Sequence, residues 1–217
     1  MHESAPGYKR FGGIPLSFTL VPDGHSLRAT VERQVRSVFL ATYGARIRSF
    51  PTLMVADTEG GAVNAAAGLR TFAEGFFSEH YFDRPLEEII ADADGEPVAR
   101  EAIVEIANLA SVRCGKIAKL IEGIVALAAA SGAEWAVFTI TPRLQALLTR
   151  LGYRVVVLGR AGRESVPHPG DWGSYYDTAP VVAAMRRPAD LLPFSNSPGV
   201  AHRASGAPGL QAVAAHV

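Results

Sequence analysis

The spacing of hydrophobic residues alternates along the chain between two patterns, and each pattern predicts one type of secondary structure. Short apolar or alternating runs bounded by turn residues predict strands, which we place at residues 14–21, 50–56, 62–71, 102–109, 135–140 and 153–158, with a last extended segment at 172–185. Apolar residues three and four positions apart predict helices, which we place at residues 27–43, 116–130 and 143–151. Ser26 is the expected N-cap of the first helix, and Gly44 is expected to end it.

The order of these elements favours an α/β fold. A strand and a helix are followed by two strands joined by a turn at residues 57–61, and then by a unit in which strands alternate with two helices. This order predicts a mixed sheet with helices on both faces, and it matches the plan of the GNAT acyltransferases. We assign the GNAT-like domain to residues 1–187 and interpret residues 188–217, which are rich in Pro, Gly, Ser and Ala, as a tail.

Composition and charge exclude several classes of protein. The 217 residues are 48% hydrophobic, which excludes a wholly disordered chain, and 21 basic residues balance 21 acidic ones, which argues against a nucleic-acid binder. The zero total hides a balance of plus four in residues 1–50 and of minus seven in an acidic insertion at residues 74–101, where short helical pieces are expected. The two blocks are compatible with a basic helix that docks an acidic acyl carrier protein and an insertion that attracts an amine, or with blocks that simply face each other.

Cysteine usage and the apolar runs bear on location. Cys114 is the only cysteine, which fits a reducing compartment. Residues 1–11 do not resemble a secretory signal, and the longest apolar run, residues 117–130, is interrupted by charges and too short to span a membrane. We therefore expect a cytoplasmic protein without a membrane span. The six histidines show no ligand-like spacing, so no metal site is expected.

Residues 101–119 join an expected central strand to an apolar helix through a short polar loop. Amides at a helix start, with cations nearby, can bind a phosphate, and the loop contains Ser111, Arg113, Cys114, Gly115 and Lys116. An acyl-CoA or acyl-carrier-protein thioester carries such a phosphate and would be a co-substrate, with no tightly bound cofactor. The alternative is a loop that binds nothing, because such junctions are common and the spacing of Arg113 and Gly115 departs from the acetyltransferase pattern. Cys114 is interpreted as a small filler of this loop, with an acyl-cysteine as the alternative.

Two polar residues interrupt the expected central strand. A lone carboxylate such as Glu105 is costly in an apolar strand unless it is paired or used in chemistry, so it is the candidate general base. Asn108 can orient a substrate carbonyl or amine near the end of the strand. The alternative for both is a structural hydrogen bond to a neighbouring arginine or to backbone groups.

Tyr175 and Tyr176 lie in the segment 172–178, which is dense in aromatic and hydroxyl groups. In an extended strand their side chains point to opposite faces. One of them is therefore expected to be buried in the core, and the other is a candidate proton donor or a wall of an acyl pocket.

Several motifs taken together resemble the thermostable hemolysin family, and the likeness covers residues 27–186. The matching segments are YGARIRSFPTLMVA (43–56), GLRTFAEGFFSEHYFDRPLEEII (68–90), VEIANLASVRCGKIAKLI (104–121), WAVFTITPRLQALLTRLGY (135–153) and WGSYYDTAP (172–180). The resemblance implies a GNAT-like fold similar to that of acyl-homoserine-lactone synthases, and a family name that derives from a lytic phenotype.

The residues favour an acyltransferase that moves an acyl group from the thioester to a small-molecule amine, in natural-product or signal biosynthesis. A lysin that acts directly on membranes is one alternative, although it requires an exposed amphipathic or spanning element that we do not find in the sequence. A GNAT-like binding module without catalysis is the other alternative.

Overall fold

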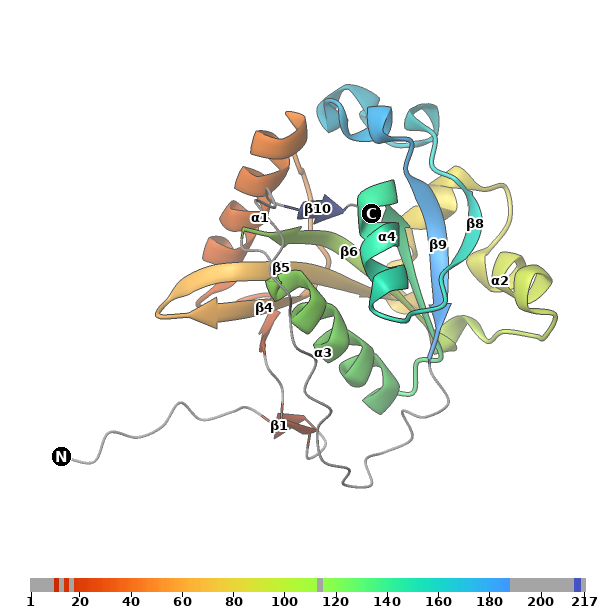
Figure 1. Cartoon of the computed structure of the whole chain (residues 1–217), viewed down its shortest axis with the longest axis horizontal. Helices are drawn as coiled ribbons and strands as arrows, with labels where there is room; N and C mark the ends of the chain where they lie inside the picture. The colour runs from red at the N-terminus through yellow and green to blue at the C-terminus, as the bar shows by residue number, and fades with distance from the viewer. Residues whose placement is uncertain (1–9, 12–13, 16–17, 113–114, 188–212, 216–217) are drawn as a thin grey trace.

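The fold is built on a mixed sheet, seen in a computed structural model that describes residues 10–11, 14–15, 18–112, 115–187 and 213–215 (Figure 1). The neighbouring strands run in the order β3-β4-β5-β6-β7-β9-β8. Their bounds are β3 Thr19–Pro22, β4 Leu53–Glu59, β5 Ala62–Thr71, β6 Ile103–Ser111, β7 Trp135–Ile140, β8 Val156–Arg160 and β9 Val181–Arg186. Two short strands, β1 (Arg10–Phe11) and β2 (Ile14–Pro15), form a separate hairpin.

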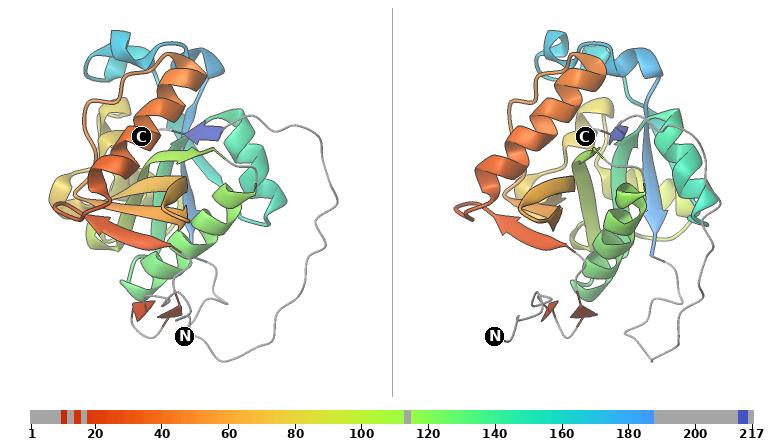
Figure 2. Two further views of the ribbon diagram at one scale, coloured as in Figure 1. Left: turned by 90° about the vertical axis from the view of Figure 1, so that its left-hand side faces the viewer. Right: turned by 60° about the vertical axis from the view of Figure 1, so that its left-hand side comes forward.

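Helices cover both faces of this sheet, as the order of elements predicts (Figure 2). One face packs against α3 (Lys116–Ala130) and α4 (Pro142–Arg150) in the largest apolar cluster. The other face packs against α1 (Arg28–Tyr43), whose buried stripe includes Val31, Val35 and Phe39. The helix α2 (Leu86–Asp94) covers the β7–β9 end of that same side through Leu86 and Ile90. The prediction of a GNAT-like α/β fold is confirmed.

The pairing of β6 and β7 is the topological feature that matters most for a site. All other pairs in the strand order are antiparallel, whereas β6 and β7 run parallel and pair only from Ile103–Glu105 to Trp135–Val137. Beyond Glu105 and Val137 the two strands are no longer paired with each other. The sheet is therefore split along the second half of β6.

Three local expectations are corrected. Ser26 is not the N-cap of α1: Leu27 occupies that position without a side-chain cap, and its amide donates to Nδ1 of His25. The turn after β4 is confined to Gly60 and Gly61, because β4 extends to Glu59. The segment 172–178 is not extended, since the 3₁₀ turns η5 (Pro169–Trp172) and η6 (Tyr175–Thr178) precede β9.

The acidic insertion has the short helical pieces that the sequence predicts. They are η1 (Phe72–Glu74), η2 (Phe77–Tyr81), α2 and η3 (Arg100–Ala102). Its acids pair mainly with arginines of the insertion itself and of β9. Arg100 contacts Glu79 and Glu87, and Arg186 contacts Asp94. These ion pairs stabilise the insertion along the β7–β9 end of the sheet.

Candidate active site

A β-bulge lies in β6 shortly after the point at which this strand separates from β7. On the β5 side the register shifts, because Ala66 lies opposite Ala110 while Gly68 lies opposite Ala107. Two residues of β6 therefore face one of β5, and Asn108, the first of them, has a left-handed φ of 52°. Bulges re-aim side chains and are frequent beside active sites. The structure thus places Asn108, a buried candidate, where the sheet splits.

The space between the separated strands is lined by apolar side chains on its α3 and α4 side. A narrow cavity of about 10 Å³ lies there between Ile106 and Leu109 of β6 and Phe138 of β7, and it is closed by residues of α3 and α4. This seam has an apolar lining, but its volume leaves room for no more than about one water molecule.

The C-terminal segment enters the same space. Strand β10 (Val213–Ala215) runs antiparallel to β6, with Val213 opposite Ser111 and Ala215 opposite Leu109. It uses the edge of β6 that β7 leaves unpaired, and Figure 1 shows it between α1 and α4. The sequence does not predict this contact, because residues 213–215 belong to the segment interpreted as a tail.

Glu105 lies at the last paired position of β6, and its side chain is fully buried. Its Oε1 accepts hydrogen bonds from the amide (2.7 Å) and hydroxyl (2.5 Å) of Ser78, and its Oε2 accepts one from the amide of Phe77 (2.8 Å). Arg70 Nε lies 3.7 Å from Oε2. Burial raises the pKa of Glu105 above its ordinary value, although these hydrogen bonds and Arg70 oppose the change. Both structural partners considered from the sequence, an arginine and backbone amides, are therefore present.

The two tyrosines occupy different environments, as the sequence predicts, although they lie on a 3₁₀ turn and not on a strand. Tyr175 is fully buried, and its hydroxyl donates to the carbonyl oxygen of Thr139 on β7 over 3.4 Å. Tyr176 is half-buried, and its hydroxyl lies 2.7 Å from that of Tyr81. Burial raises the pKa of Tyr176 to about 12, so it carries its proton at neutral pH. Both rings lie on the α1 and α2 side of the split sheet.

The junction between β6 and α3 contains the residues expected to bind a phosphate. Gly115 is the N-cap of α3 with φ of 81°, and Ser111 is buried with its Oγ donating to the carbonyl of Asn64. Lys116 Nζ lies 3.4 Å from Asp57 and 3.5 Å from Glu59. A phosphate at this helix start would compete with these acids for Lys116. Arg113 and Cys114 lie outside the described residues.

A larger cavity opens on the α1 side. It has a volume of about 260 Å³. We call it the arginine pocket, because the ionisable side chains that line it are Arg46, Arg48, Arg70, His80, His168 and Asp171. Phe77 and Trp172 form its apolar walls. The sequence analysis does not identify this pocket. Arg70 is the residue that a sequence signal could have revealed, since it is a charge within a strand whose preceding residues are apolar.

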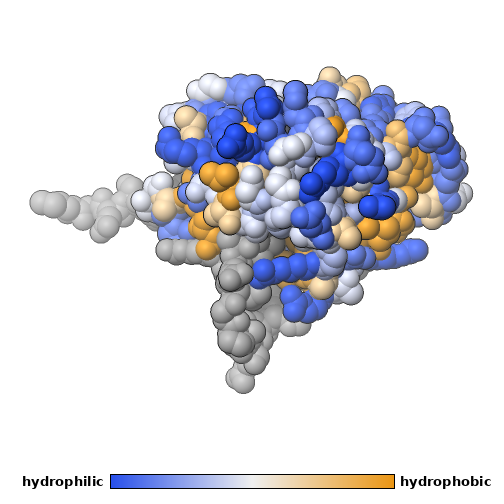
Figure 3. All heavy atoms as spheres, turned by 90° about the horizontal axis from the view of Figure 1, so that it is seen from above, coloured by the Kyte–Doolittle hydropathy of each residue, from blue (hydrophilic) through white to orange (hydrophobic). Residues whose placement is uncertain are grey.

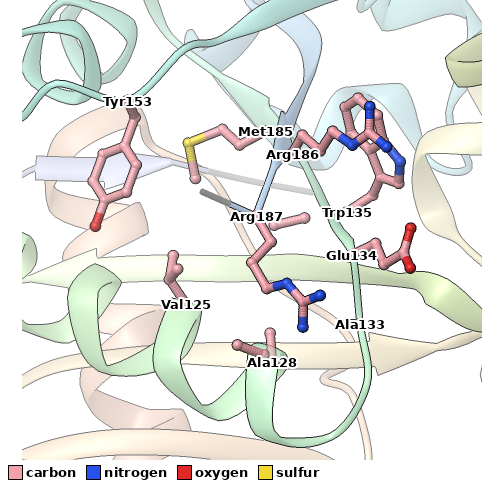
Figure 4. A pocket seen from close by; sticks show the side chains of 11 residues that line it. Val125, Ala128, Ala133, Glu134, Trp135, Tyr153, Met185, Arg186 and Arg187 are labelled. Carbon is pink, nitrogen blue, oxygen red and sulfur yellow. The ribbon is translucent and has the colours of Figure 1, made fainter. Parts of the chain in front are cut away.

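Another hollow is too small for an acyl chain. It lies near the start of β7, between Val125 and Ala128 of α3, Tyr153, and Met185 and Arg187 (Figure 4). Its volume of about 20 Å³ holds about one water molecule.

The described part of the chain contains neither a membrane-spanning helix nor a cluster of metal ligands. None of its helices is both long and apolar enough to cross a membrane. None of its clusters of His, Cys, Asp and Glu reaches the three residues that a metal ion requires.

Several solved structures share the fold of this chain, although their sequences are only 11–15% identical to it. The acyl-homoserine lactone synthase BjaI, described as CoA-dependent and bound to SAM and isopentyl-CoA, is 15% identical with a TM-score of 0.56, over 81% of this chain and 85% of that chain. FeeM, an N-acyl amino acid synthase from uncultured soil microbes, is 15% identical with a TM-score of 0.54, over 79% of this chain and 96% of that chain. The AHL synthase LasI is 11% identical with a TM-score of 0.53, over 80% of this chain and 92% of that chain.

Comparison with curated proteins gives no match. The sequence model of a family described as thermostable hemolysin matches residues 21–190, well over half of the chain. The match includes the split between β6 and β7, the Asn108 bulge and residues 172–178, which contain Tyr175 and Tyr176 and which we call the tyrosine turn. The resemblance that the motifs indicate is confirmed, and this chain belongs to the thermostable hemolysin family.

Proposed function

We propose that the protein is an N-acyltransferase, which moves an acyl group from an acyl-CoA or acyl-carrier-protein thioester to a small-molecule amine. The observation that carries the proposal is the split of the sheet beyond Glu105 and Val137, with a bulge at Asn108. The edge of β6 that β7 leaves can hydrogen-bond to the amides of a pantetheine arm as it does to β10, which the arm would displace. The seam beside it is apolar, and because its volume is only about 10 Å³, its lining side chains must move apart to hold an acyl chain.

The reaction requires one nucleophilic attack and two proton transfers. The neutral amine nitrogen attacks the thioester carbonyl carbon, so that a C–N bond forms and the C–S bond breaks. Glu105 accepts the proton lost by the amine, directly or through water, and Asn108 orients the reacting groups. Tyr175 or Tyr176 donates a proton to the departing thiolate.

The phosphate of the thioester is assigned to the loop at residues 111–116, with Ser111, Arg113, Cys114, Gly115 and Lys116 as its surroundings. Lys116 exchanges its acidic partners for the phosphate when the thioester binds. The thioester is a co-substrate in this proposal, which includes no tightly bound cofactor. We place the protein in the cytoplasm, where both kinds of thioester are made.

The deciding experiment measures thiol release. The purified chain of 217 residues is incubated with acyl-CoA and acyl-carrier-protein thioesters of several lengths and a panel of amines, and free thiol and amide product are quantified. We expect amine-dependent release of thiol with stoichiometric amide. Amine-independent release would indicate a thioesterase, and absence of release with every pair would contradict the proposal.

Glu105→Gln removes the proposed base while it keeps the shape of the side chain. We expect it to lower kcat by at least about 10²-fold, as for loss of a general base. Ser78→Ala is the matched control, because it removes one hydrogen bond to Glu105 but keeps the carboxylate. If the two variants lose activity equally, Glu105 only holds the Phe77–Ser78 turn in place.

The family description favours a second candidate, a lysin that acts on membranes. It is tested with the same protein by release of dye from lipid vesicles without thioester or amine. Dye release together with absence of thiol release supports the lysin. Thioester binding without transfer or lysis supports a binding module.

A further inference from the structure

The arginine pocket is a cation-rich cavity beside the proposed reaction centre. Three arginines line it against one carboxylate, Asp171, which is already in an ion pair with Arg48. His80 and His168 add ring nitrogens that can donate hydrogen bonds. The lining therefore favours a ligand that carries a negative charge.

Arg70 lies at the inner end of this pocket. Its side chain is only 18% exposed, and its Nε has no hydrogen-bond partner. Because that nitrogen is shielded from solvent, Arg70 would act on a carboxylate in the pocket through the charge of its guanidinium group, which lines the pocket. The nearest acidic oxygen, Oε2 of Glu105, is 3.7 Å from that nitrogen.

The walls and the position of the pocket define the rest of the ligand. The rings of Phe77 and Trp172 lie with their centroids 6.1 Å apart and give an apolar surface. Arg70 is the cross-strand partner of Glu105, whereas the loop expected to bind phosphate begins six residues later, roughly 20 Å along β6. The pocket is thus near the proposed base and remote from the proposed phosphate site.

We propose that the acyl acceptor is an amine that also carries a carboxylate, such as an α-amino acid or a compound derived from one, and that the arginine pocket binds its carboxylate. This inference rests on the proposed acyl transfer. Arg70, with Arg46 or Arg48, contacts the carboxylate, the aromatic walls contact the side chain, and the amine is left on the side of β6. The anion-rich insertion is then not needed to attract the acceptor.

The test compares each amino acid with its carboxamide, which has the same amine and side chain but lacks the charge. We expect the wild type to use the amino acid with at least tenfold higher kcat/KM. The double variant Arg46→Gln/Arg48→Gln, at two exposed positions, is expected to bring this ratio close to one while the KM for the thioester is unchanged. Arg150→Gln, an exposed arginine on α4, is the matched control.

Two outcomes overturn the inference. One is equal use of amino acids and carboxamides by the wild type. The other is a higher KM for the thioester in the double variant, which would place the donor's phosphates in this pocket.

Calorimetry keeps the inference testable without turnover. Amino acids and their carboxamides are titrated into the wild type and the double variant. Binding of an amino acid that the double variant loses supports the pocket even if no transfer is seen, in which case the proposed function alone fails. Absence of binding by every amino acid, in the presence and absence of CoA, contradicts the inference.

Discussion

A carboxylate without solvent exposure is stable inside a protein only when its oxygens are hydrogen-bonded. Glu105 meets this condition through Phe77 and Ser78, which lie 27 and more residues away in the sequence. The same contacts fix the start of η2, whose Tyr81 reaches the hydroxyl of Tyr176. One buried side chain thus connects the central strand with the insertion and, through it, with the tyrosine turn.

The pKa of Glu105 makes a prediction about stability. Burial raises this pKa above the ordinary value of 4.5. A carboxyl group with a higher pKa in the folded state stabilises the fold fully below about pH 4.5, and this stabilisation is lost as the pH rises through the folded-state pKa. We expect the free energy of unfolding of the wild type to fall, relative to that of Glu105→Gln, as the pH is raised above about 4.5. Urea unfolding of both proteins at a series of pH values checks this, and parallel curves would contradict it.

The tyrosine turn makes a second prediction at the residue scale. Tyr176 is half-exposed and its hydroxyl meets that of Tyr81, so it can pass on a proton, whereas the hydroxyl of Tyr175 is held by a backbone carbonyl. We expect Tyr176→Phe to lower kcat by about 10²-fold with little change in KM. Tyr175→Phe is expected to cost about 1 kcal/mol of stability and to leave kcat close to that of the wild type. The reverse pattern in steady-state kinetics would assign the proton transfer to Tyr175.

At the scale of elements, packing on α1 explains why the tyrosine turn is not the extended segment that the sequence predicts. The segment is dense in aromatic and hydroxyl residues and is expected from the sequence to be extended, but tertiary contacts decide the backbone. Gly173 has φ of 52°, and a Cβ atom there would lie 2.0 Å from the carbonyl oxygen of Tyr43 at the end of α1. The amide of Ser174 donates to that same oxygen. Close packing on α1 therefore bends the segment.

Strand β10 makes a prediction about the C-terminal segment. It pairs with residues 109–111 of β6 along the edge that the proposed thioester would use, and both cannot occupy that edge together. We expect removal of residues 188–217 to lower the KM for the thioester several-fold without loss of kcat. Ala214→Pro, which removes one amide from β10 in the full-length chain, is expected to act in the same direction. An unchanged or higher KM in both variants would show that β10 and the thioester do not compete.

At the scale of the whole molecule, no ion pair between described residues joins the basic block, residues 1–50, to the acidic insertion, residues 74–101. Arg28 and Arg36 bind Glu32 of their own helix, and Arg48 binds Asp171. In Figure 1 one end of α1 points to the top of the molecule. Figure 3 views the molecule from that side and shows hydrophilic residues over much of the face, with smaller apolar patches among them. If a partner docks on the exposed face of α1, complementary charge would guide it.

Arg33 tests whether that partner is an acyl carrier protein. It is exposed on α1, and its hydrogen bond to Thr30 is local. If the donor is an acidic carrier protein, we expect Arg33→Glu to raise the KM for the acyl-carrier-protein thioester three- to fivefold, about 1 kcal/mol, and less at high salt. The KM for acyl-CoA serves as the control and should not change. Equal effects on both donors would argue against a carrier-protein surface on α1.

The sequence by itself determined the elements, their order and hence the GNAT-like fold, because hydrophobic periodicity and turn residues are local signals. It also identified Glu105 and Asn108, since a polar residue inside an apolar strand is conspicuous. Only the tertiary structure decided that β6 and β7 separate after three paired positions and that β10 lies in the gap. Only the tertiary structure assembled the arginine pocket, from a loop, a strand and two 3₁₀ turns. The end of strand pairing and the shape of a cavity depend on contacts between residues far apart in the chain, which a local pattern does not specify.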